Sequence, residues 1–271
     1  MRNIRLTIEF DGSGFSGWQF QPNRPTVQGA LEAALAKILG EKTTAYGCSR
    51  TDAGVSARDY VANFHTDSRL PTRRFPVALN ANLPETICVK AVAEAGPEFH
   101  ARFSAKGKTY LYRIVRGRSP LRSGRAWEFT FPADTAKMAR ALRLFLGRHD
   151  FSRFCFLPSA GHNPFPGRGH DPFQSSEMGS CPKSGTKSGN PTPGYCTIRQ
   201  ARLAARGDEF LITISGDRFL YKLVRRMVGA SVAYGSGRLT LSDIRAALAG
   251  RQHLPFTTAP ACGLVLDSVR Y

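Results

Sequence analysis

The sequence predicts an α+β fold of two ferredoxin-like halves, each a split βαβ unit with a mixed, mainly antiparallel sheet. Segments in which apolar and polar residues alternate, typical of half-buried strands, are interspersed with segments of helical periodicity. In the first half these segments follow the order β-α-β-β-α-β, and the second half repeats the pattern with additions. We expect the halves to comprise residues 1–105 and 106–271, with a basic cleft between their sheets.

The first half begins with a strand over residues 3–10. A helix follows, for which Thr26 is a favourable N-cap and Gly40 a natural terminator. Its apolar positions are Val27, Leu31, Leu35, Ile38 and Leu39. The other elements expected in this half are strands at 43–49, 60–66 and 87–92 and a short helix at 72–80.

The second half contains five segments of strand character and three of helical character. The strands are expected at 108–116, 125–131, 196–205, 209–215 and 263–269. The helices are expected around 218–234, around 242–250 and over a segment with Met138, Leu142, Phe145 and Leu146 on its apolar side. Residues 157–195 are rich in Gly, Pro and Ser and show little periodicity, which predicts a partly disordered surface insertion.

The charge of the chain predicts a polyanionic partner. Lys and Arg number 38 against 20 Asp and Glu, a formal net charge of +18. No apolar run reaches the roughly 20 residues that cross a bilayer. The chain opens on a strand pattern rather than a signal peptide, so we expect a cytoplasmic protein.

Cysteine and histidine spacing gives no metal signal. The six cysteines are scattered without disulfide or zinc-ribbon spacing, as expected for reduced thiols. A zinc site formed by His162, His170, Cys181 and Cys196 is the alternative, but this spacing matches no compact ligand set. We therefore expect no bound metal.

The run from Cys48 to Ala57 carries the chemistry. Asp52 follows Arg50 by two residues, and Ala53-Gly54 then permits a sharp turn. If strand geometry extended to this point, both side chains would share one face, and the guanidinium would favour the ionised carboxylate. Such a carboxylate can act as a nucleophile. The alternative is an Asx-turn closed by a surface ion pair.

This run resembles the catalytic loop of the tRNA pseudouridine synthase A family, Gly-Arg-Thr-Asp-Ala-Gly-Val-His. The resemblance extends nearly from end to end of the chain. It includes Phe10-Asp11-Gly12-Ser13, Gly17-Trp18-Gln19, Thr26-Val27-Gln28-Gly29, Asn80-Ala81-Asn82-Leu83-Pro84, Phe99-His100-Ala101-Arg102-Phe103, Lys108-Thr109-Tyr110, His149-Asp150-Phe151-Ser152, Leu223-Val224-Arg225 and Ala259-Pro260-Ala261-Cys262-Gly263-Leu264.

The resemblance implies a pseudouridine synthase fold and a role for five residues. Asp52 corresponds to the catalytic aspartate, as nucleophile or as base, with Arg50 as its partner and Arg225 as a second cation. Tyr110 would stack on the target base and Leu264 would form an apolar wall. The implied reaction isomerises uridine in the anticodon stem-loop of tRNA, at positions 38 to 40, without a cofactor. A homodimer bound to tRNA is implied as well.

Three positions depart from the family pattern. Ser49 stands where the family usually has Gly, Ser56 where it has His, and Asn63 replaces the His expected before Phe64. Two other functions therefore stay open. One is a noncatalytic RNA-binding protein or RNA chaperone on the same scaffold, and the other is a paralogous synthase that acts on another RNA.

Overall fold

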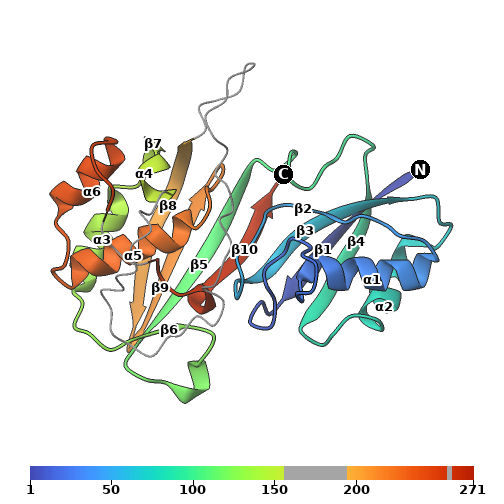
Figure 1. Cartoon of the computed structure of the whole chain (residues 1–271), viewed down its shortest axis with the longest axis horizontal. Helices are drawn as coiled ribbons and strands as arrows, with labels where there is room; N and C mark the ends of the chain where they lie inside the picture. The colour runs from blue at the N-terminus through green and yellow to red at the C-terminus, as the bar shows by residue number, and fades with distance from the viewer. Residues whose placement is uncertain (156–193, 255–257) are drawn as a thin grey trace. The chain divides into compact units, whose positions relative to one another are not determined.

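The computed structural model describes residues 1–155, 194–254 and 258–271. The chain forms two compact units (Figure 1). Unit 1 comprises Met1–Leu111 and Leu264–Tyr271, and unit 2 comprises Tyr112–Gly263. These limits differ from the expected 1–105 and 106–271 chiefly because the C-terminal strand joins unit 1. That strand pairs with one formed far earlier in the chain, which local sequence patterns do not indicate.

Unit 1 contains a mixed sheet with the strand order β4-β1-β3-β10, and β2 pairs with β3. The strand β1 is antiparallel to both of its neighbours, whereas β10 is parallel to β3. The strands are β1 (Arg2–Phe10), β2 (Tyr46–Gly47), β3 (Ser56–Thr66), β4 (Ile87–Ala95) and β10 (Leu264–Arg270), and β5 (Gly107–Arg116) crosses the unit boundary. The β-α-β-β-α-β order predicted for the first half is confirmed, as is the α+β class.

Two helices accompany this sheet, α1 (Val27–Leu39) and α2 (Phe75–Asn80), the latter preceded by a 3-10 turn, Thr72–Arg74. The predicted ends of α1 are confirmed. The Thr26 hydroxyl accepts a hydrogen bond of 3.2 Å from the Gly29 amide, and Gly40 ends the helix with a φ of +75°.

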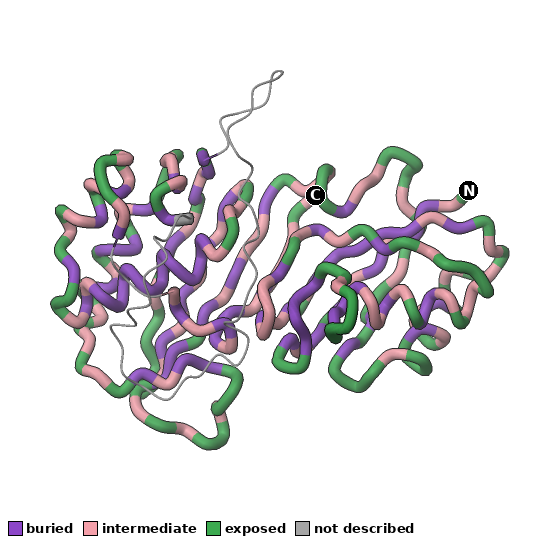
Figure 2. Tube along the Cα trace, in the orientation of Figure 1, coloured by how far each residue is buried: buried purple, intermediate pink, exposed green. Residues whose placement is uncertain are grey.

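The core of unit 1 lies on one face of the sheet. Alternate residues of β1, among them Ile4 and Leu6, are fully buried, and the Phe64 ring of β3 packs against Phe75 of α2 at 5.6 Å. Figure 2 shows buried stretches of these strands in purple. The intervening residues, such as Asn3 and Arg5, point to the opposite, more polar face.

Unit 2 contains an antiparallel ladder of β7, β8 and β9, and β6 runs parallel to β5. Its helix α3 packs against α5 and against β8. The elements are β6 (Trp127–Phe129), α3 (Thr135–Arg143), β7 (Gly147–Asp150), α4 (Ser152–Cys155), β8 (Tyr195–Arg206), β9 (Glu209–Gly216), α5 (Leu223–Gly235), α6 (Leu241–Leu248) and a 3-10 turn, Ala261–Gly263. None of the described helices is both long and apolar enough to cross a lipid bilayer.

Several expected elements have different limits. The strand predicted at 43–49 pairs only over Tyr46–Gly47. The helix predicted from 218 begins at Leu223, because Lys222 before it adopts a left-handed conformation with φ of +56°. The short elements β7 and α4 were not predicted, since four residues are too few for a periodic pattern. Leu146, assigned to an apolar helix face, lies beyond the end of α3 and is exposed.

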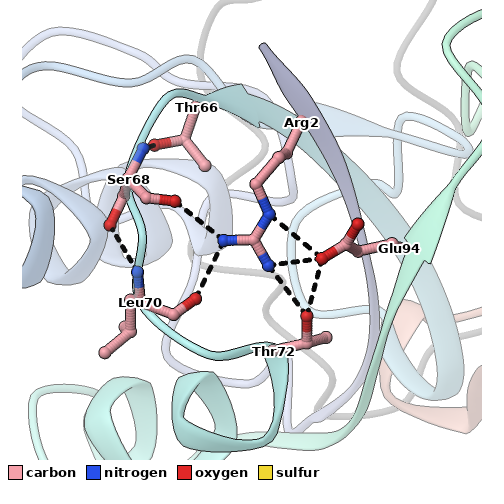
Figure 3. A network of polar contacts seen from close by, with 6 residues as sticks. All are labelled: Arg2, Thr66, Ser68, Leu70, Thr72 and Glu94. Carbon is pink, nitrogen blue, oxygen red and sulfur yellow. Dashed lines mark hydrogen bonds and ion pairs between the residues drawn. The ribbon is translucent and has the colours of Figure 1, made fainter.

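Arg2 joins β1, β4 and the segment that follows β3 (Figure 3). Its guanidinium donates hydrogen bonds to the carbonyls of Ser68 at 2.7 Å and Leu70 at 2.9 Å, and to the Thr72 hydroxyl at 2.9 Å. The Glu94 carboxylate on β4 accepts two further bonds from the same group. The hydrogen bond from Arg2, and next that from Thr72, lower the pKa of Glu94 below its usual 4.5.

We predict that Glu94→Gln flattens the acid limb of the stability curve. A carboxyl group whose pKa is lowered in the folded state contributes stability above its unfolded pKa, and this contribution is lost as pH falls through the folded pKa. Urea unfolding between pH 5 and pH 2 should therefore show a shallower loss of unfolding free energy in Glu94→Gln than in wild type. Glu85→Gln, at an exposed glutamate of the same unit, is the control. Equal slopes in the Glu94 variant and in wild type would contradict the assignment.

Candidate active site

Asp52 lies in the loop 48–55, which joins β2 to β3 in unit 1 and is called the aspartate loop below. The loop ends in a turn closed by a hydrogen bond of 3.2 Å from the Val55 amide to the Asp52 carbonyl. Gly54, at the third position of this turn, has a φ of +77°, as a type II turn requires. The turn fixes the backbone at Asp52. Asp52 itself is half-buried, so it is partly exposed to solvent.

The segment 11–18 lies against the aspartate loop and is joined to it by backbone hydrogen bonds. The Trp18 amide donates to the Thr51 carbonyl at 3.3 Å, and the Gly54 amide donates to the Phe15 carbonyl at 3.2 Å. Both bonds join main-chain groups, so they fix the path of the loop independently of its side chains. Segment 11–18 therefore holds the backbone on both sides of Asp52, at Thr51 before it and at Gly54 after it.

Two glycines permit this close approach. A Cβ atom on Gly12 would overlap the Val55 carbonyl oxygen, and one on Gly17 would overlap the Thr51 carbonyl oxygen. Gly17 also has a φ of +92°, a conformation that L side chains rarely adopt. Main-chain atoms cannot move aside as a flexible side chain can, so both positions require glycine.

Aromatic rings support the start of the loop. The Trp18 and Tyr60 rings stack with centroids 4.3 Å apart and an interplanar angle of 26°. The Tyr60 hydroxyl donates a short hydrogen bond to the Ser49 carbonyl. A Cβ atom on Gly47 would overlap this hydroxyl, so glycine is needed where β2 passes over the ring pair.

Two side chains of the loop carry an acidic group that can become a nucleophile on ionisation, the thiol of Cys48 and the carboxyl group of Asp52. Cys48 is fully buried, and burial raises the pKa of its thiol to about 11, so the thiol stays protonated and unreactive near neutral pH. Asp52 is the more exposed of the two. The geometry therefore selects the carboxylate as the group able to meet a substrate.

Tyr110 of β5 belongs to the same cluster. Burial raises the pKa of its phenol, a hydrogen bond with the Ser49 side chain lowers it, and the charge of Asp52 raises it. The phenol is consequently neutral and lies within electrostatic range of the Asp52 carboxylate. Tyr110, which lies in the strand predicted at 108–116, therefore interacts with the aspartate loop within unit 1.

Leu264 lies at the first position of β10. The next residue, Val265, is the parallel partner of Ser56, the first residue of β3 after the aspartate loop. Parallel strands that begin in register begin at the same edge of a sheet. Leu264 is therefore close to the end of the aspartate loop, and its side chain is buried there.

Arg50 lies on the exposed side of the loop. Strand geometry ends at Gly47, so the alternation that would place Arg50 and Asp52 on one face does not apply. Arg50 is exposed, and over residues 1–155, 194–254 and 258–271 no ion pair of its guanidinium is formed. Its role as partner of Asp52 stays a prediction.

Arg225 lies in unit 2, on α5, and is only 6% exposed, so it is not part of a solvated basic face. Its Nε donates a hydrogen bond of 2.6 Å to the Ala259 carbonyl, and the Ala259 amide donates back to the Arg225 carbonyl at 3.2 Å. These bonds fix the arginine within unit 2. Its role as a second cation at Asp52 stays a prediction.

The departures from the family pattern have structural uses. The Ser56 hydroxyl accepts a hydrogen bond of 3.0 Å from the Gly12 amide, which adds to the attachment of segment 11–18. Asn63 is fully buried, and its amide group donates to the Asn3 side chain at 2.9 Å and accepts from the Ala101 amide at 2.8 Å. Both residues therefore help to shape unit 1.

Gln28 is a structural residue of this region that sequence reasoning missed. Its side-chain oxygen accepts from Gln19 and from the Phe20 amide, both at 2.8 Å, and its nitrogen donates to Glu32 and to the Ala45 carbonyl. Gln28 therefore joins α1 to residues 19–20 before the helix and to Ala45 after it. A glutamine on the apolar face of a helix is the signal that could have revealed it.

The zinc alternative involves residues that lie mostly outside the described parts of the chain, namely His162, His170 and Cys181. Cys196 is buried in β8, and burial raises the pKa of its thiol to about 11. Among the described residues, no group of three or more His, Cys, Asp or Glu side chains is arranged to hold a metal ion.

Comparison with known proteins gives consistent matches. The family described as tRNA pseudouridine synthase matches residues 6–104 and 141–271, which include Asp52, Arg225 and Leu264 but not Tyr110. The chain is 38% identical over 273 residues to tRNA pseudouridine synthase A of Moorella thermoacetica, covering 99% of both chains. The enzymes of the same name from Clostridium botulinum strain Eklund 17B and Geobacter sp. strain M21 are each 37% identical, with 99% to 100% of both chains covered.

We predict that Gly17→Ala displaces the aspartate loop. The added Cβ meets the Thr51 carbonyl in a left-handed backbone, so we expect a loss of roughly 1–3 kcal/mol in unfolding free energy. Gly14→Ala is the matched control, because a Cβ there meets nothing within 4 Å. Urea denaturation measures both variants. Equal stability of the two would show that the close approach does not constrain the loop.

Proposed function

Since this chain belongs to the tRNA pseudouridine synthase family, we propose that it isomerises uridine to pseudouridine in tRNA. The observation that supports this most directly is the aspartate loop. It holds one partly exposed carboxylate, that of Asp52, on a backbone fixed by a turn and by segment 11–18. The net charge of +18 suits a polyanionic substrate.

The reaction needs no external reagent. The bond between N1 of uracil and C1′ of ribose breaks, the base rotates, and a bond forms between C5 and C1′. The proton leaves C5 and N1 gains one, so the change is balanced without redox chemistry or an imported group. Asp52 would act as a nucleophile on the ribose or the base, or as a base that removes a ribose proton.

The neighbouring residues would prepare the base and the carboxylate. The ring of Tyr110, whose phenol is neutral, would stack on the target base. Buried Leu264 would exclude water from that base. Arg50 and Arg225 would supply positive charge to the carboxylate and to the nearby phosphates. These assignments extend the family resemblance to the named residues of this chain.

We further propose that the substrates are uridines at positions 38 to 40, on the 3′ side of the anticodon stem-loop. The target base must leave its stack, which costs a few kcal/mol and costs least near a loop. We assign the activity to the cytoplasm, where such an enzyme would meet its tRNA. A homodimer would provide a surface long enough for tRNA, which is larger than one 29.7 kDa chain.

We predict that Asp52→Asn abolishes turnover and retains tRNA binding. The amide keeps the shape of the side chain but removes its charge, so pseudouridine formation should fall by several orders of magnitude. The measurement is tritium release from an anticodon stem-loop labelled at C5 of uridine, together with tRNA affinity and melting temperature. Asp67→Asn, at a largely exposed aspartate of the same unit, is the control.

Release at the wild-type rate by a folded Asp52→Asn protein would refute the catalytic assignment. Wild-type protein that binds tRNA but releases no tritium would favour the noncatalytic RNA-binding alternative. Activity on another RNA but not on the tRNA stem-loop would favour the paralogous synthase.

We predict a homodimer in solution. Sedimentation velocity at micromolar concentration should give twice the mass of the 29.7 kDa chain without tRNA, and the mass of two chains plus the bound RNA with it. A monomer under both conditions, at concentrations where the protein is active, would exclude the dimer as the working form.

A further inference from the structure

Unit 1 carries a cluster of four rings, called the ring cluster below, in which Tyr46 and Phe103 are exposed and His65 and His100 are half-buried. The His100 ring lies 4.4 Å from Phe103 and 5.2 Å from Tyr46, and Tyr46 lies 6.3 Å from His65. Phe103 is 77% exposed and Tyr46 is 40% exposed. Exposed rings gathered in this way, rather than scattered singly, mark an interaction surface.

Buried polar groups hold the ring cluster in place. Asn63 accepts a hydrogen bond from the Ala101 amide, and the Asn3 side chain donates to the Gly96 and Phe99 carbonyls at 3.0 and 2.8 Å. The Tyr271 hydroxyl donates to the Ala101 carbonyl at 2.7 Å. The backbone beneath His100 and Phe103 is therefore tied to β1, β3 and the C-terminus, so the rings are preorganised.

Hydrogen bonds inside the turn fix it further. The Ser104 hydroxyl accepts from the His100 amide at 3.0 Å, and the Ser104 amide donates to the His100 carbonyl at 2.9 Å. The His100 Nδ1 accepts a hydrogen bond of 3.1 Å from the Arg102 amide, and this bond fixes the orientation of the imidazole ring. A rigid ring surface binds a partner with little loss of conformational entropy.

The local charge favours a nucleic acid. The Arg102 guanidinium lies 5.7 Å from the centre of the Phe103 ring. Burial first, and then the charges of Arg102 and His65, lower the pKa of His100, which favours a neutral ring beside the Arg102 cation. Aromatic faces beside arginine are the combination that binds unpaired bases and their phosphates.

We propose that the ring cluster is a stacking platform for an unpaired base of the bound tRNA, a base other than the uridine that reacts at Asp52. This inference rests on the proposed function for the identity of the RNA. Tyr46 is followed after one residue by the aspartate loop, so a base held on the platform would help to place the RNA relative to that loop. Phe103 and Tyr46 are positioning residues in this account.

The test compares Phe103→Ala, Phe103→Trp and Arg102→Gln in the full-length protein. An unmodified tRNA transcript is the probe, and fluorescence anisotropy measures its affinity at several salt concentrations. Steady-state pseudouridine formation gives kcat and KM. Phe20→Ala is the matched control, since Phe20 is an exposed phenylalanine of the same unit, outside the ring cluster.

Loss of one stacked base should weaken tRNA affinity about 5- to 100-fold in Phe103→Ala, with KM rising more than kcat falls. Stacking involves no phosphate, so the slope of log affinity against log salt should stay as in wild type. Arg102→Gln should instead reduce that slope by about 0.7, the value for one phosphate contact on a single strand. Phe103→Trp should restore affinity, and Phe20→Ala should bind as wild type.

Wild-type affinity in Phe103→Ala would overturn the platform. Unchanged affinity together with loss of the dimer in sedimentation would also overturn it, and would assign the rings to a contact between two copies. The outcomes separate this inference from the proposed function. A wild-type protein without synthase activity whose RNA binding still depends on Phe103 would support the platform and contradict the enzyme.

Discussion

The close approach of segment 11–18 to the aspartate loop is the constraint on which the rest of the candidate site depends. It brings two stretches of main chain into contact at points where no Cβ fits, at Gly12 and at Gly17. The turn at residues 52–55, the start of β3 and the path of the chain into α1 all follow from that contact.

Polar side chains connect this contact to the remainder of unit 1, and of these Gln28 and Asn63 are buried and Arg2 is half-buried. Gln28 joins the start of α1 to the residues before β2, Asn63 joins β3 to the turn at residue 101, and Arg2 joins β1 to β4. Each is a polar side chain whose hydrogen bonds are made inside the unit, which offsets the cost of burying it. Asn63 shares a face of the sheet with Asn3 and with Tyr46 and His65 of the ring cluster, because Asn63 pairs with Tyr46 and Asn3 pairs with His65.

The elements of unit 1 could be predicted where local signals decide them. Thr26 and Gly40 mark the ends of α1 because capping depends on a few adjacent residues. The pairing of β10 with β3 could not be predicted, because it joins residues far apart in the sequence. The strand β2 is limited to Tyr46–Gly47, and the packing of Gly47 over Tyr60 is a tertiary contact that local patterns do not reveal.

The candidate site shows the same division. The motif predicts Asp52 as the reactive residue and the resemblance predicts Tyr110 beside it; both roles stay predictions, and in the structure Tyr110 interacts with Ser49 and Asp52. The side-by-side placement expected of Arg50 and Asp52 assumed a strand that ends too early. The hydrogen bonds of Ser56 and Asn63 could not be predicted from the sequence, since their partners lie in other segments of the chain.

Pseudouridine mapping of an unmodified tRNA transcript after incubation with the purified chain, in buffer without any cofactor, tests the central claim most directly. Mass spectrometry or chemical mapping would locate the product. The account predicts pseudouridine at one or more of positions 38 to 40, and none in a transcript with cytidine at those positions. A transcript that is bound by the folded protein and yet contains no pseudouridine at any position would contradict it.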